Sequence, residues 1–374
     1  MIVFFLVVIL VYAVTMAQLI YGFGKIKTYV PKTKNPQTYF SIVVPFRNEA
    51  QNLPDLLDSF KKLDYPIDLF ELILVDDFSE DNSQRIVYNW RMENGAFEFT
   101  LLENIKITGS PKKDAIARAI HIVKQQWVVT TDADCTFPAH WLRTLDSYIQ
   151  ENQAEMLIGS VQYTDGNSLI RNFQQLDLTS LQGATMGSFG LGLGFMCNGA
   201  NFAYTKSLFH ELGGFAGNSD KATGDDVFLV QKAAAKHPEK VHYLKSEGNI
   251  VVTKPLKNWG AVFQQHSRWA SKAGAYQSVF GKDLAVIVFL GNLCALAALV
   301  FAVLKQISWI DFAIVFGIKF LIDTILLYKT NQFLNRKWMK WLLVSSLIYP
   351  FFSVLVAAYA VCFGYRWKGR KFKS

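Results

Sequence analysis

Trp127-Val128-Val129-Thr130-Thr131-Asp132-Ala133-Asp134 is the stretch of sequence that decides the fold. Its first five residues are apolar or β-branched, which is the composition of a buried β-strand, and the run stops abruptly at two carboxylates. The i, i+2 spacing places Asp132 and Asp134 on the same side of an extended chain. In open α/β sheets this end of a strand faces the ligand crevice, so the pair is a candidate binding site.

The D-x-D pattern has two interpretations. Hard oxygen ligands at a strand end suit Mg²⁺ or Mn²⁺, and such a metal binds diphosphate oxygens while one or two carboxylates hold it. Alternatively, an acidic residue caps a helix, because Phe137-Pro138-Ala139-His140-Trp141 is typical of a helix start. The pattern alone does not decide between them, so the rest of the chain has to.

Strand-like and helix-like patterns alternate over residues 38 to 260. Apolar runs predict four strands, at 39–45, 70–75, 97–102 and 127–131. Apolar residues at helical spacing predict helices between them, at 53–60, 86–90 and 112–124. This alternation indicates an α/β fold with a mostly parallel sheet and right-handed crossovers, which we place at residues 38–255.

Apolar residues are concentrated at the two ends of the chain. Hydrophobic residues make up 51% of the 374, more than is usual for a purely soluble protein. Residues 1–22 carry no charge and show neither a basic start nor a clear cleavage site, so we predict an uncleaved transmembrane anchor at 1–24. Lys25, Lys27 and Lys32 follow it, and by the positive-inside rule they place the central domain on the cytosolic face of the inner membrane.

Three further apolar segments are each long enough to cross a bilayer, at 284–304, 309–328 and 341–363. The middle one carries Lys319 and Asp323, four residues apart, which can neutralise each other or face a protein interior. If all three span, the basic tail at 366–374 lies outside, against the positive-inside rule. Either one segment is re-entrant or interfacial, or the rule fails here. We therefore predict a C-terminal transmembrane region at 284–365 with two or three spans.

The net charge of +8 does not indicate nucleic-acid binding. Many basic residues flank the apolar segments, where anionic headgroups explain them, and no zinc-finger, helix-turn-helix or RNA-recognition pattern occurs. The four cysteines are far apart in the sequence, so neither a zinc site nor a disulfide framework is predicted. The glycine-rich run 190–194 does not open a helix in a strand–turn–helix unit; we reject a dinucleotide loop and expect a flexible segment.

Five motifs in a fixed order resemble those of the membrane-bound family 2 glycosyltransferases of GT-A fold. They are V-V-P-F-R-N-E at 43–49, V-D-D-F-S-E-D-N-S at 75–83, D-A-D at 132–134, T-G-D-D at 223–226 and Q-H-S-R-W at 265–269. Ceramide glucosyltransferases, bacterial lipid glycosyltransferases and polysaccharide synthases share this arrangement. The resemblance covers about residues 38–275 and extends to the flanking membrane helices. It implies a GT-A domain between N- and C-terminal transmembrane helices.

The resemblance implies a nucleotide-sugar site at the ends of the first two strands. Asp76 and Asp77 would accept hydrogen bonds from the base or ribose, although Asp77 can also simply stabilise a turn. Pro45, Arg47 and Glu49 would line the same crevice, and Arg47 can equally be a solvated loop charge.

The diphosphate side of the predicted site contains lysines and the D-x-D pair. Lys112 and Lys113 open a helix and resemble the lysine region of relatives; we select Lys113, but the sequence does not show which one points inward. A solvated basic pair is the alternative. The resemblance implies that Asp134 is the ligand of Mn²⁺ or Mg²⁺ and that Asp132 contacts the sugar or ribose. A metal there would offset the charge on the leaving nucleoside diphosphate.

For catalysis the resemblance implies Asp226 as general base, beside Asp225, which replaces the family's usual glutamate. The base takes the proton of the acceptor hydroxyl as its oxygen attacks the anomeric carbon, and a single displacement inverts that carbon. The alternative is two acids that only cap a helix beginning at Val227. Because Asp225 stands where the family usually has glutamate, the sequence leaves open which of the two carboxylates acts as the base.

The Q-x-x-R-W motif lies in an amphipathic, interfacial stretch at 256–283. Gln265, Arg268 and Trp269 share one helical face, where arginine suits a departing diphosphate and tryptophan a sugar or acceptor. A plain interfacial helix would also use tryptophan and arginine. Asn198 belongs to a loop that resembles the family's acceptor side.

We therefore predict a metal-dependent, inverting transferase that moves a sugar from a nucleotide-sugar donor, preferably UDP-linked, to a lipid or membrane-held glycan. A processive polysaccharide synthase is the nearest alternative, although three C-terminal segments leave little material for a translocation channel. A non-catalytic membrane scaffold or transporter component with this fold is a further alternative.

Overall fold

The computed structural model describes residues 2–32, 35–218, 223–367 and 370–372. The chain forms two compact units. We call residues 27–164 and 195–254 the sheet unit, and residues 1–26, 165–194 and 255–374 the helical unit. Part of the predicted basic tail, with Lys368 and Lys373, lies outside the described residues.

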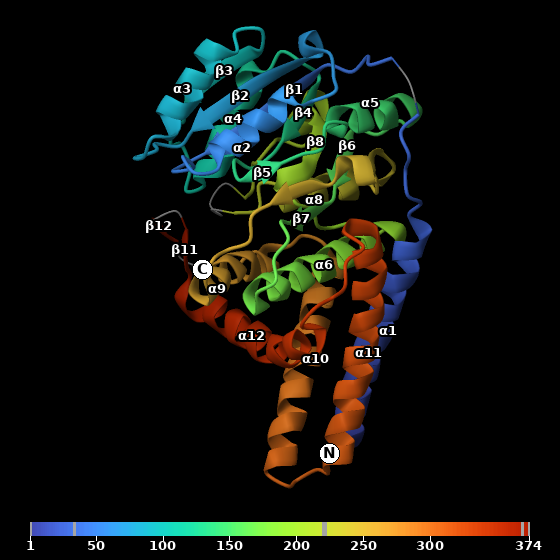
Figure 1. Cartoon of the computed structure of the whole chain (residues 1–374). Helices are drawn as coiled ribbons and strands as arrows, with labels where there is room; N and C mark the ends of the chain where they lie inside the picture. Colours follow the sequence, from blue (N-terminus) through green and yellow to red (C-terminus); the bar gives the residue numbers. More distant parts are fainter. Residues whose placement is uncertain (1, 33–34, 219–222, 368–369, 373–374) are drawn as a thin grey trace. The chain divides into compact units, whose positions relative to one another are not determined.

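The sheet unit is organised around a seven-stranded sheet with strand order β3-β2-β1-β4-β8-β6-β9 (Figure 1). Its strands are β1 (Phe40–Phe46), β2 (Phe70–Asp76), β3 (Glu98–Glu103), β4 (Trp127–Thr130), β6 (Met156–Gly159), β8 (Phe202–Thr205) and β9 (Val241–Leu244). Strands β3, β2, β1 and β4 run parallel, β6 and β9 are parallel to each other, and β8 runs antiparallel to both of its neighbours. The predicted mostly parallel α/β sheet is confirmed.

Helices flank this sheet, as the sequence pattern predicted. They are α2 (Leu53–Lys61), α3 (Ser83–Glu93), α4 (Pro111–Ile122), α5 (Trp141–Glu151), α7 (Lys206–Glu211) and α8 (Val227–Lys236). A small second sheet joins β5 (Cys135–Thr136), β10 (Val251–Thr253) and β7 (Val161–Tyr163). Every residue of β2 and β4 is buried, which explains why these strands are continuous apolar runs in the sequence.

The register of the parallel strands brings their carboxyl ends to one edge of the sheet. Phe46, the last residue of β1, pairs with Asp76, the last residue of β2, and Asp76 pairs with Glu103 of β3. Strand β4 runs parallel beside β1 and ends at Thr130. The motifs that follow β1, β2 and β4 therefore leave the sheet at the same edge.

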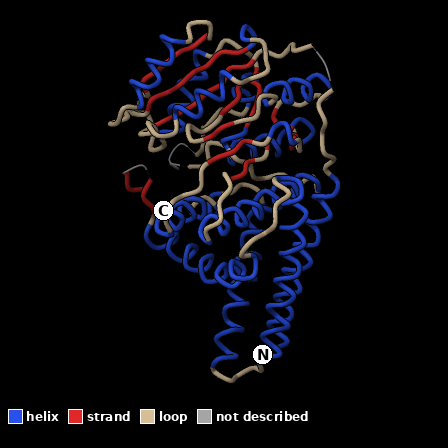
Figure 2. The backbone as a smooth tube through the Cα atoms, viewed as in Figure 1, coloured by secondary structure: helices blue, strands red, loops and turns tan. Residues whose placement is uncertain are grey.

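The helical unit contains six helices in the described part of the chain (Figure 2). They are α1 (Ile2–Lys25), α6 (Leu169–Gly190), α9 (Trp259–Ala270), α10 (Val279–Val303), α11 (Trp309–Leu334) and α12 (Leu342–Phe363). Helices α1, α10 and α11 pack alongside one another, whereas α6, α9 and α12 run across them (Figure 1). A short hairpin of β11 (Tyr365–Trp367) and β12 (Arg370–Phe372) follows α12.

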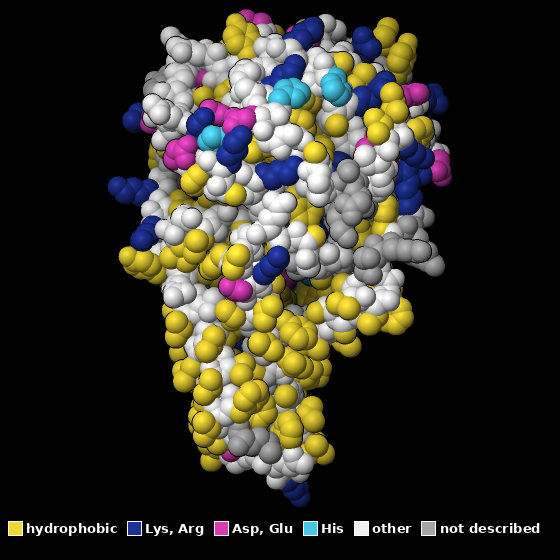
Figure 3. All heavy atoms as spheres, turned by 180° about the vertical axis from the view of Figure 1, so that it is seen from behind, with side chains coloured by type: hydrophobic (Ala, Val, Ile, Leu, Met, Phe, Trp, Pro, Cys, Tyr) yellow, Lys and Arg dark blue, Asp and Glu magenta, His cyan; other side chains and the backbone are white. Residues whose placement is uncertain are grey.

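Among the described residues, α1, α10 and α12 are long and apolar enough to cross a membrane by length and composition. Figure 3 shows hydrophobic side chains covering the part of the molecule where the long helices run. Exposed apolar residues on these helices include Val7, Val286 and Leu321. Such a surface is the kind that faces lipid hydrocarbon.

Glycines let the backbones of α1 and α6 touch. A Cβ atom at Gly22 would lie 2.1 Å from the carbonyl oxygen of Gly187, and one at Gly190 would lie 1.8 Å from the carbonyl oxygen of Gly22. No larger residue fits at these positions, as in the small-residue contacts of membrane helices. Gly190 is therefore the packed end of α6, whereas we expected a flexible segment; Gly192, with φ +74°, makes the turn that follows.

A charged group is buried between α1 and α11. The Lys319 ammonium lies 2.6 Å from the Asp323 carboxylate, and the Tyr12 hydroxyl donates to Asp323 at 2.6 Å. Lys319 is 5% exposed. The prediction that Lys319 and Asp323 neutralise each other is confirmed.

Candidate active site

A lysine and two carboxylates from three separate elements meet in the sheet unit. The Lys112 ammonium lies 2.7 Å from Asp132 Oδ1 and 3.3 Å from Asp225 Oδ2. Lys112 belongs to the first turn of α4, Asp132 follows β4, and Asp225 precedes α8. We call Lys112, Asp132, Asp225 and the adjoining Asp226 the carboxylate cluster.

The cluster is partly shielded from solvent. The side chains of Lys112 and Asp225 are 19% and 11% exposed, and that of Asp132 is 38% exposed. Burial alone would lower the pKa of Lys112, but attraction to Asp132, Asp225 and Asp226 outweighs this and raises it. The lysine therefore stays charged at neutral pH.

Asp226 is held by two backbone amides. Its Oδ1 accepts a hydrogen bond from the Val227 amide at 2.7 Å, as N-cap of α8, and its Oδ2 accepts one from the Gly199 amide at 2.8 Å. Gly224, with φ +84°, makes the turn that precedes it. The capping interpretation thus describes one oxygen, while the second is fixed by a different segment. Such amide contacts orient the carboxylate.

The loop that carries Asn198 lies against both acids. A Cβ atom at Gly199 would lie 3.3 Å from Asp226 Oδ2 and 3.4 Å from Asp225 Oδ2. The Asn198 side chain accepts a hydrogen bond from the Ala200 amide and so fixes this turn. Within the described residues, Asn198 therefore belongs to the same site as the two acids.

Neither aspartate of the D-x-D pair caps a helix, because α5 begins at Trp141 and its N-cap is His140. Asp134 is half-buried, and the Cys135 thiol lies 3.6 Å from its Oδ1. The described part of the chain contains no group of three or more His, Cys, Asp or Glu side chains arranged to hold a metal. Mg²⁺ and Mn²⁺ do not need such a cage, because one or two carboxylates suffice when phosphate oxygens complete the shell. The oxygen donors of Asp132 and Asp134 fit that chemistry.

Lys113 occupies a different environment from its neighbour. Its ammonium donates to the Asn218 carbonyl at 2.6 Å, and it lies 5.3 Å from the centre of the Phe228 ring. The side chain is 2% exposed. We selected Lys113 from the sequence, but the ion pairs with Asp132 and Asp225 come from Lys112.

The segments that follow β1 and β2 are tied together by Arg47. Its guanidinium donates to the Asp77 carbonyl at 2.8 Å and to the Phe78 carbonyl, and it forms an ion pair with Glu80 at 2.6 Å. The Arg47 side chain is only 12% exposed, so it is not a solvated loop charge. Phe78, with φ +58°, takes a left-handed conformation that these contacts stabilise.

The acidic residues at this edge are also fixed by partners. Asp76 accepts hydrogen bonds from the Ser79 amide at 3.1 Å and from Gln84 at 2.5 Å. Asp77 accepts one from Asn104 at 2.9 Å. Sequence reasoning missed Gln84 and Asn104, because no local pattern marks a residue that supports a carboxylate from another element.

Pro45 and Glu49 complete this edge. Pro45 pairs in register with Val75, and the Glu49 carboxylate accepts a hydrogen bond from the Asn52 side chain at 2.7 Å. Pro45 thus pairs with β2 and Arg47 contacts the segment after it, whereas the Glu49 carboxylate is held by Asn52; that the three line a nucleotide site stays a prediction.

In the helical unit, Gln265, Arg268 and Trp269 lie half-buried on α9, while His266 between them is buried. The His266 ring lies 2.7 Å from Asp177 of α6 and 4.9 Å, centroid to centroid, from the Trp269 ring. Burial would lower the pKa of His266, but Asp177 outweighs this effect and raises it. The two residues lie 89 positions apart, so no local pattern marks this pair.

Comparison with known proteins relates part of the chain to a family. Residues 41–213 match the model of glycosyl transferase family 2. A stretch of 130 residues is 27% identical to the poly(ribitol-phosphate) β-N-acetylglucosaminyltransferase TarS of Staphylococcus aureus, covering 35% of this chain and 22% of TarS. A longer stretch of 286 residues is 23% identical to the poly-β-1,6-N-acetyl-D-glucosamine synthase of Staphylococcus epidermidis, covering 76% of this chain and 65% of the synthase.

A solved structure shares the fold over almost the whole chain. It is the mannosyltransferase PcManGT of Pyrobaculum calidifontis in complex with GDP-Man and Mn²⁺, which has a TM-score of 0.59 and 19% identity and covers 93% of this chain and 95% of that one. At this identity the likeness establishes the fold. Together with the carboxyl-end motifs, the family match shows that residues 41–213 form a family 2 glycosyltransferase domain of GT-A type.

Proposed function

We propose that the chain is an inverting glycosyltransferase that moves a sugar from a nucleotide-sugar donor to a lipid or membrane-held glycan. The observation that carries this proposal is the carboxylate cluster. It joins the end of β4 to the start of α8 beside the edge where β1 and β2 end. A partly exposed group of acids at this edge suits both donor binding and proton transfer.

Asp226 is the general base in this proposal. The amides of Gly199 and Val227 each donate to one oxygen of its carboxylate and so fix its orientation, and a carboxylate oriented in this way can take the proton of the acceptor hydroxyl. Asp225 forms an ion pair with the Lys112 ammonium at 3.3 Å, so we assign it to holding that lysine and not to proton transfer.

The reaction balances as a single displacement. The acceptor oxygen forms a bond to the anomeric carbon while the bond from that carbon to the phosphate oxygen breaks. The nucleoside diphosphate leaves with the electron pair, and the hydroxyl proton passes to Asp226. Attack opposite the leaving group inverts the anomeric configuration.

The donor is held by the edge residues. Asp76 and Asp77 accept hydrogen bonds from base or ribose, and Arg47 holds their loop in shape. Asp134, with Asp132 beside it, would hold Mn²⁺ or Mg²⁺ at the diphosphate. Such a metal supplies positive charge that stabilises the leaving group. PcManGT carries Mn²⁺ with GDP-Man, which supports a divalent metal but leaves the choice between UDP- and GDP-linked sugars to experiment.

The acceptor is proposed to be membrane-held because of the apolar helices. Lys25 ends α1, and Lys27 and Lys32 follow it, so we place the sheet unit on the cytosolic face of the inner membrane. The match to a poly-β-1,6-N-acetyl-D-glucosamine synthase over 76% of this chain favours a polysaccharide synthase as a second candidate.

The test is donor turnover in membranes that contain the full-length chain. UDP- and GDP-linked sugars are screened with Mn²⁺, and release of nucleoside diphosphate is measured together with the length of the labelled product. We expect metal-dependent release that Asp226→Asn and Asp134→Ala abolish, and that Asp58→Asn, an exposed acid on α2, leaves unchanged. Single-sugar products support transfer to a lipid, and long polymers support the synthase. Full turnover by both site variants would overturn the assigned roles.

A further inference from the structure

Length and composition select one pair of C-terminal helices as membrane-crossing, and the packing of the helical unit indicates another. By composition, α10 and α12 qualify as spans and α11 does not. The arrangement of the helices points instead to α10 and α11 as the crossing pair. We propose that α12 lies in the surface of the cytosolic leaflet with its outer face on the acyl chains, so that the basic C-terminal hairpin stays on the side where α1 ends.

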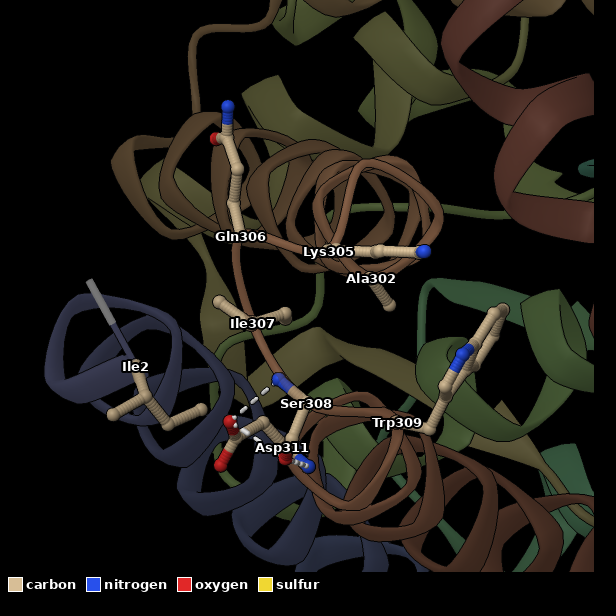
Figure 4. A pocket seen from close by; sticks show the side chains of 8 residues that line it. All are labelled: Ile2, Ala302, Lys305, Gln306, Ile307, Ser308, Trp309 and Asp311. Carbon is tan, nitrogen blue, oxygen red and sulfur yellow. Dashed lines mark hydrogen bonds between the residues drawn. The ribbon is translucent and has the colours of Figure 1, made fainter.

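The far end of the helical unit is defined by three termini that lie together. An open pocket there is lined by Ile2 at the start of α1, Lys305 just after α10 and Trp309 at the start of α11 (Figure 4). Helix α10 therefore runs toward the end where α1 begins, and α11 runs back. With 26 residues α11 extends about 39 Å, enough to cross a hydrocarbon core of about 30 Å.

The charges of α11 do not prevent it from spanning. Lys319 and Asp323 neutralise each other and are closed off by Tyr12 of α1. Intramembrane charges that pair within a helix bundle are tolerated in this way. Helix α11 differs from a typical span by its charged residues, and two of these, Lys319 and Asp323, pair with each other.

Helix α12 does not run alongside the crossing helices but across them (Figures 1 and 2). Its inner face packs on α10, α9 and α6. The Phe352 ring lies 5.1 Å from Phe173 of α6 and 5.0 Å from His266 of α9. Phe263 of α9 contacts both Phe352, at 6.1 Å, and Tyr359, at 5.2 Å. Two α12 residues seven positions apart thus reach one residue of α9.

The chain after α12 returns to α9 as well. Strand β11 packs against α9, and Tyr365 in it is 5% exposed. Helix α9 precedes α10 by only a few residues and so lies at the near end of the unit. A spanning α12 of 22 residues would carry its C-terminus about 33 Å away, beyond reach of α9.

The outer face of α12 fits lipid hydrocarbon. Its exposed side chains include Leu343, Leu347, Phe351 and Leu355, which recur every four residues and are 44% to 61% exposed. The loop from α11 to α12 carries Arg336, Lys337 and Lys340, and the tail is also basic. An apolar stripe flanked by basic residues is the pattern of a helix that lies on an anionic leaflet. This topology also satisfies the positive-inside rule, which three C-terminal spans would violate.

Accessibility of single cysteines in the full-length chain tests the proposal. Gln306→Cys, Arg336→Cys and Arg370→Cys are placed separately in a background without the four native cysteines and treated with a membrane-impermeant maleimide. We expect Gln306→Cys to react in intact cells, and the other two to react only in inverted vesicles. Labelling of Arg370→Cys from outside would overturn the surface position of α12, and labelling of Gln306→Cys and Arg336→Cys from the same side would show that α11 does not cross.

Two further measurements test the topology independently, in case the cysteine variants do not fold. A C-terminal fluorescent-protein fusion of the wild-type chain should fluoresce, and the matching alkaline phosphatase fusion should be inactive; the reverse result would contradict the proposal. Spin labels at Leu343 and Leu355 should then report nearly equal depths in the bilayer. The matched pair Val286 and Val300 on α10 should differ by roughly 21 Å, the length of 14 helical residues. A depth difference of about 18 Å along α12 would mean that it spans.

Discussion

Two lysine–aspartate pairs of nearly equal length lie in different surroundings. In the carboxylate cluster, the Lys112 ammonium is 2.7 Å from Asp132, and the partners come from separate elements of the sheet unit. In the helical unit, Lys319 is 2.6 Å from Asp323, four residues away on the same helix, and Tyr12 closes the group. The first group keeps partly exposed oxygens that a ligand can use, whereas the second is satisfied internally. The length of an ion pair therefore does not reveal its role; the accessibility of its remaining oxygens does.

Asp226→Asn should have the largest effect, and it tests the role of the carboxylate cluster. Asparagine keeps an acceptor oxygen for the cap of α8, but its amide nitrogen cannot accept the second backbone hydrogen bond, from Gly199, and the variant cannot take a proton. We expect turnover to fall by about 100-fold or more, the usual contribution of a general base, with a small decrease in melting temperature for the lost hydrogen bond. Nucleoside diphosphate release and melting temperature are measured side by side. A larger loss in Asp225→Asn than in Asp226→Asn would exchange the roles of the two acids.

Asp323→Ala should destabilise the buried group of Lys319, Asp323 and Tyr12. It leaves the Lys319 ammonium buried without its carboxylate, which typically costs about 3–5 kcal/mol. We expect a lower melting temperature in detergent and less protein in the membrane, with turnover per folded molecule unchanged. The double variant Lys319→Met, Asp323→Leu should recover most of the stability, since it removes both charges. If the double variant is as unstable as the single one, the loss of stability does not come from leaving Lys319 without its partner.

Lys112→Gln tests whether the cation of the carboxylate cluster contributes to donor turnover. The variant removes a charge-assisted contact to Asp132 and Asp225, and we expect the kcat/KM for the donor to fall by roughly 10- to 100-fold, matching about 1.5–3 kcal/mol. Lys113→Gln is the matched neighbour. Because Lys113 is buried against the Asn218 carbonyl, it should lower the melting temperature more than Lys112→Gln does. A larger loss of kcat/KM in Lys113→Gln than in Lys112→Gln would instead assign donor binding to Lys113.

The His266–Asp177 pair should give the smallest effect, seen in the pH dependence of stability. Because the pKa of His266 is raised in the folded chain, its protonated form stabilises the fold. This contribution is complete below the unfolded pKa of about 6.5 and is lost as the pH rises through the higher folded value. Melting temperatures of the wild type and His266→Gln are compared from pH 5 to 9. The advantage of the wild type should shrink as the pH rises, and parallel curves would show that the ion pair does not form.

Much of the fold follows from the sequence because buried parallel strands require continuous apolar runs. The runs that became β1, β2 and β4 carry the site motifs at their ends, so the position of Asp76 and Asp132 at one edge follows from topology. The choice between Lys112 and Lys113 does not, because adjacent helical residues point about 100° apart and the tertiary register decides which one faces the acids.

Other features depend on partners that no local pattern reveals. The capping and catalytic interpretations of Asp226 looked like alternatives in the sequence, yet one oxygen of the carboxylate caps α8 while the other accepts from the Gly199 amide of a distant segment. The prediction of two or three C-terminal spans rested on hydropathy, which measures composition and not direction. The course of α12 across the other helices is set by its packing on α6 and α9.

The meeting of the α1 and α6 backbones at Gly22, Gly187 and Gly190 limits how this protein can be engineered. Residues 2–25 are not an interchangeable leader, because a leucine-rich anchor in their place would push α6 aside. Removing them to obtain a soluble fragment would strip α6 of its partner and expose a face of small residues to aggregation. Helix α1 precedes α6 by more than 140 residues, so the contact between these two helices can form only after strands β1 to β7 have been synthesised.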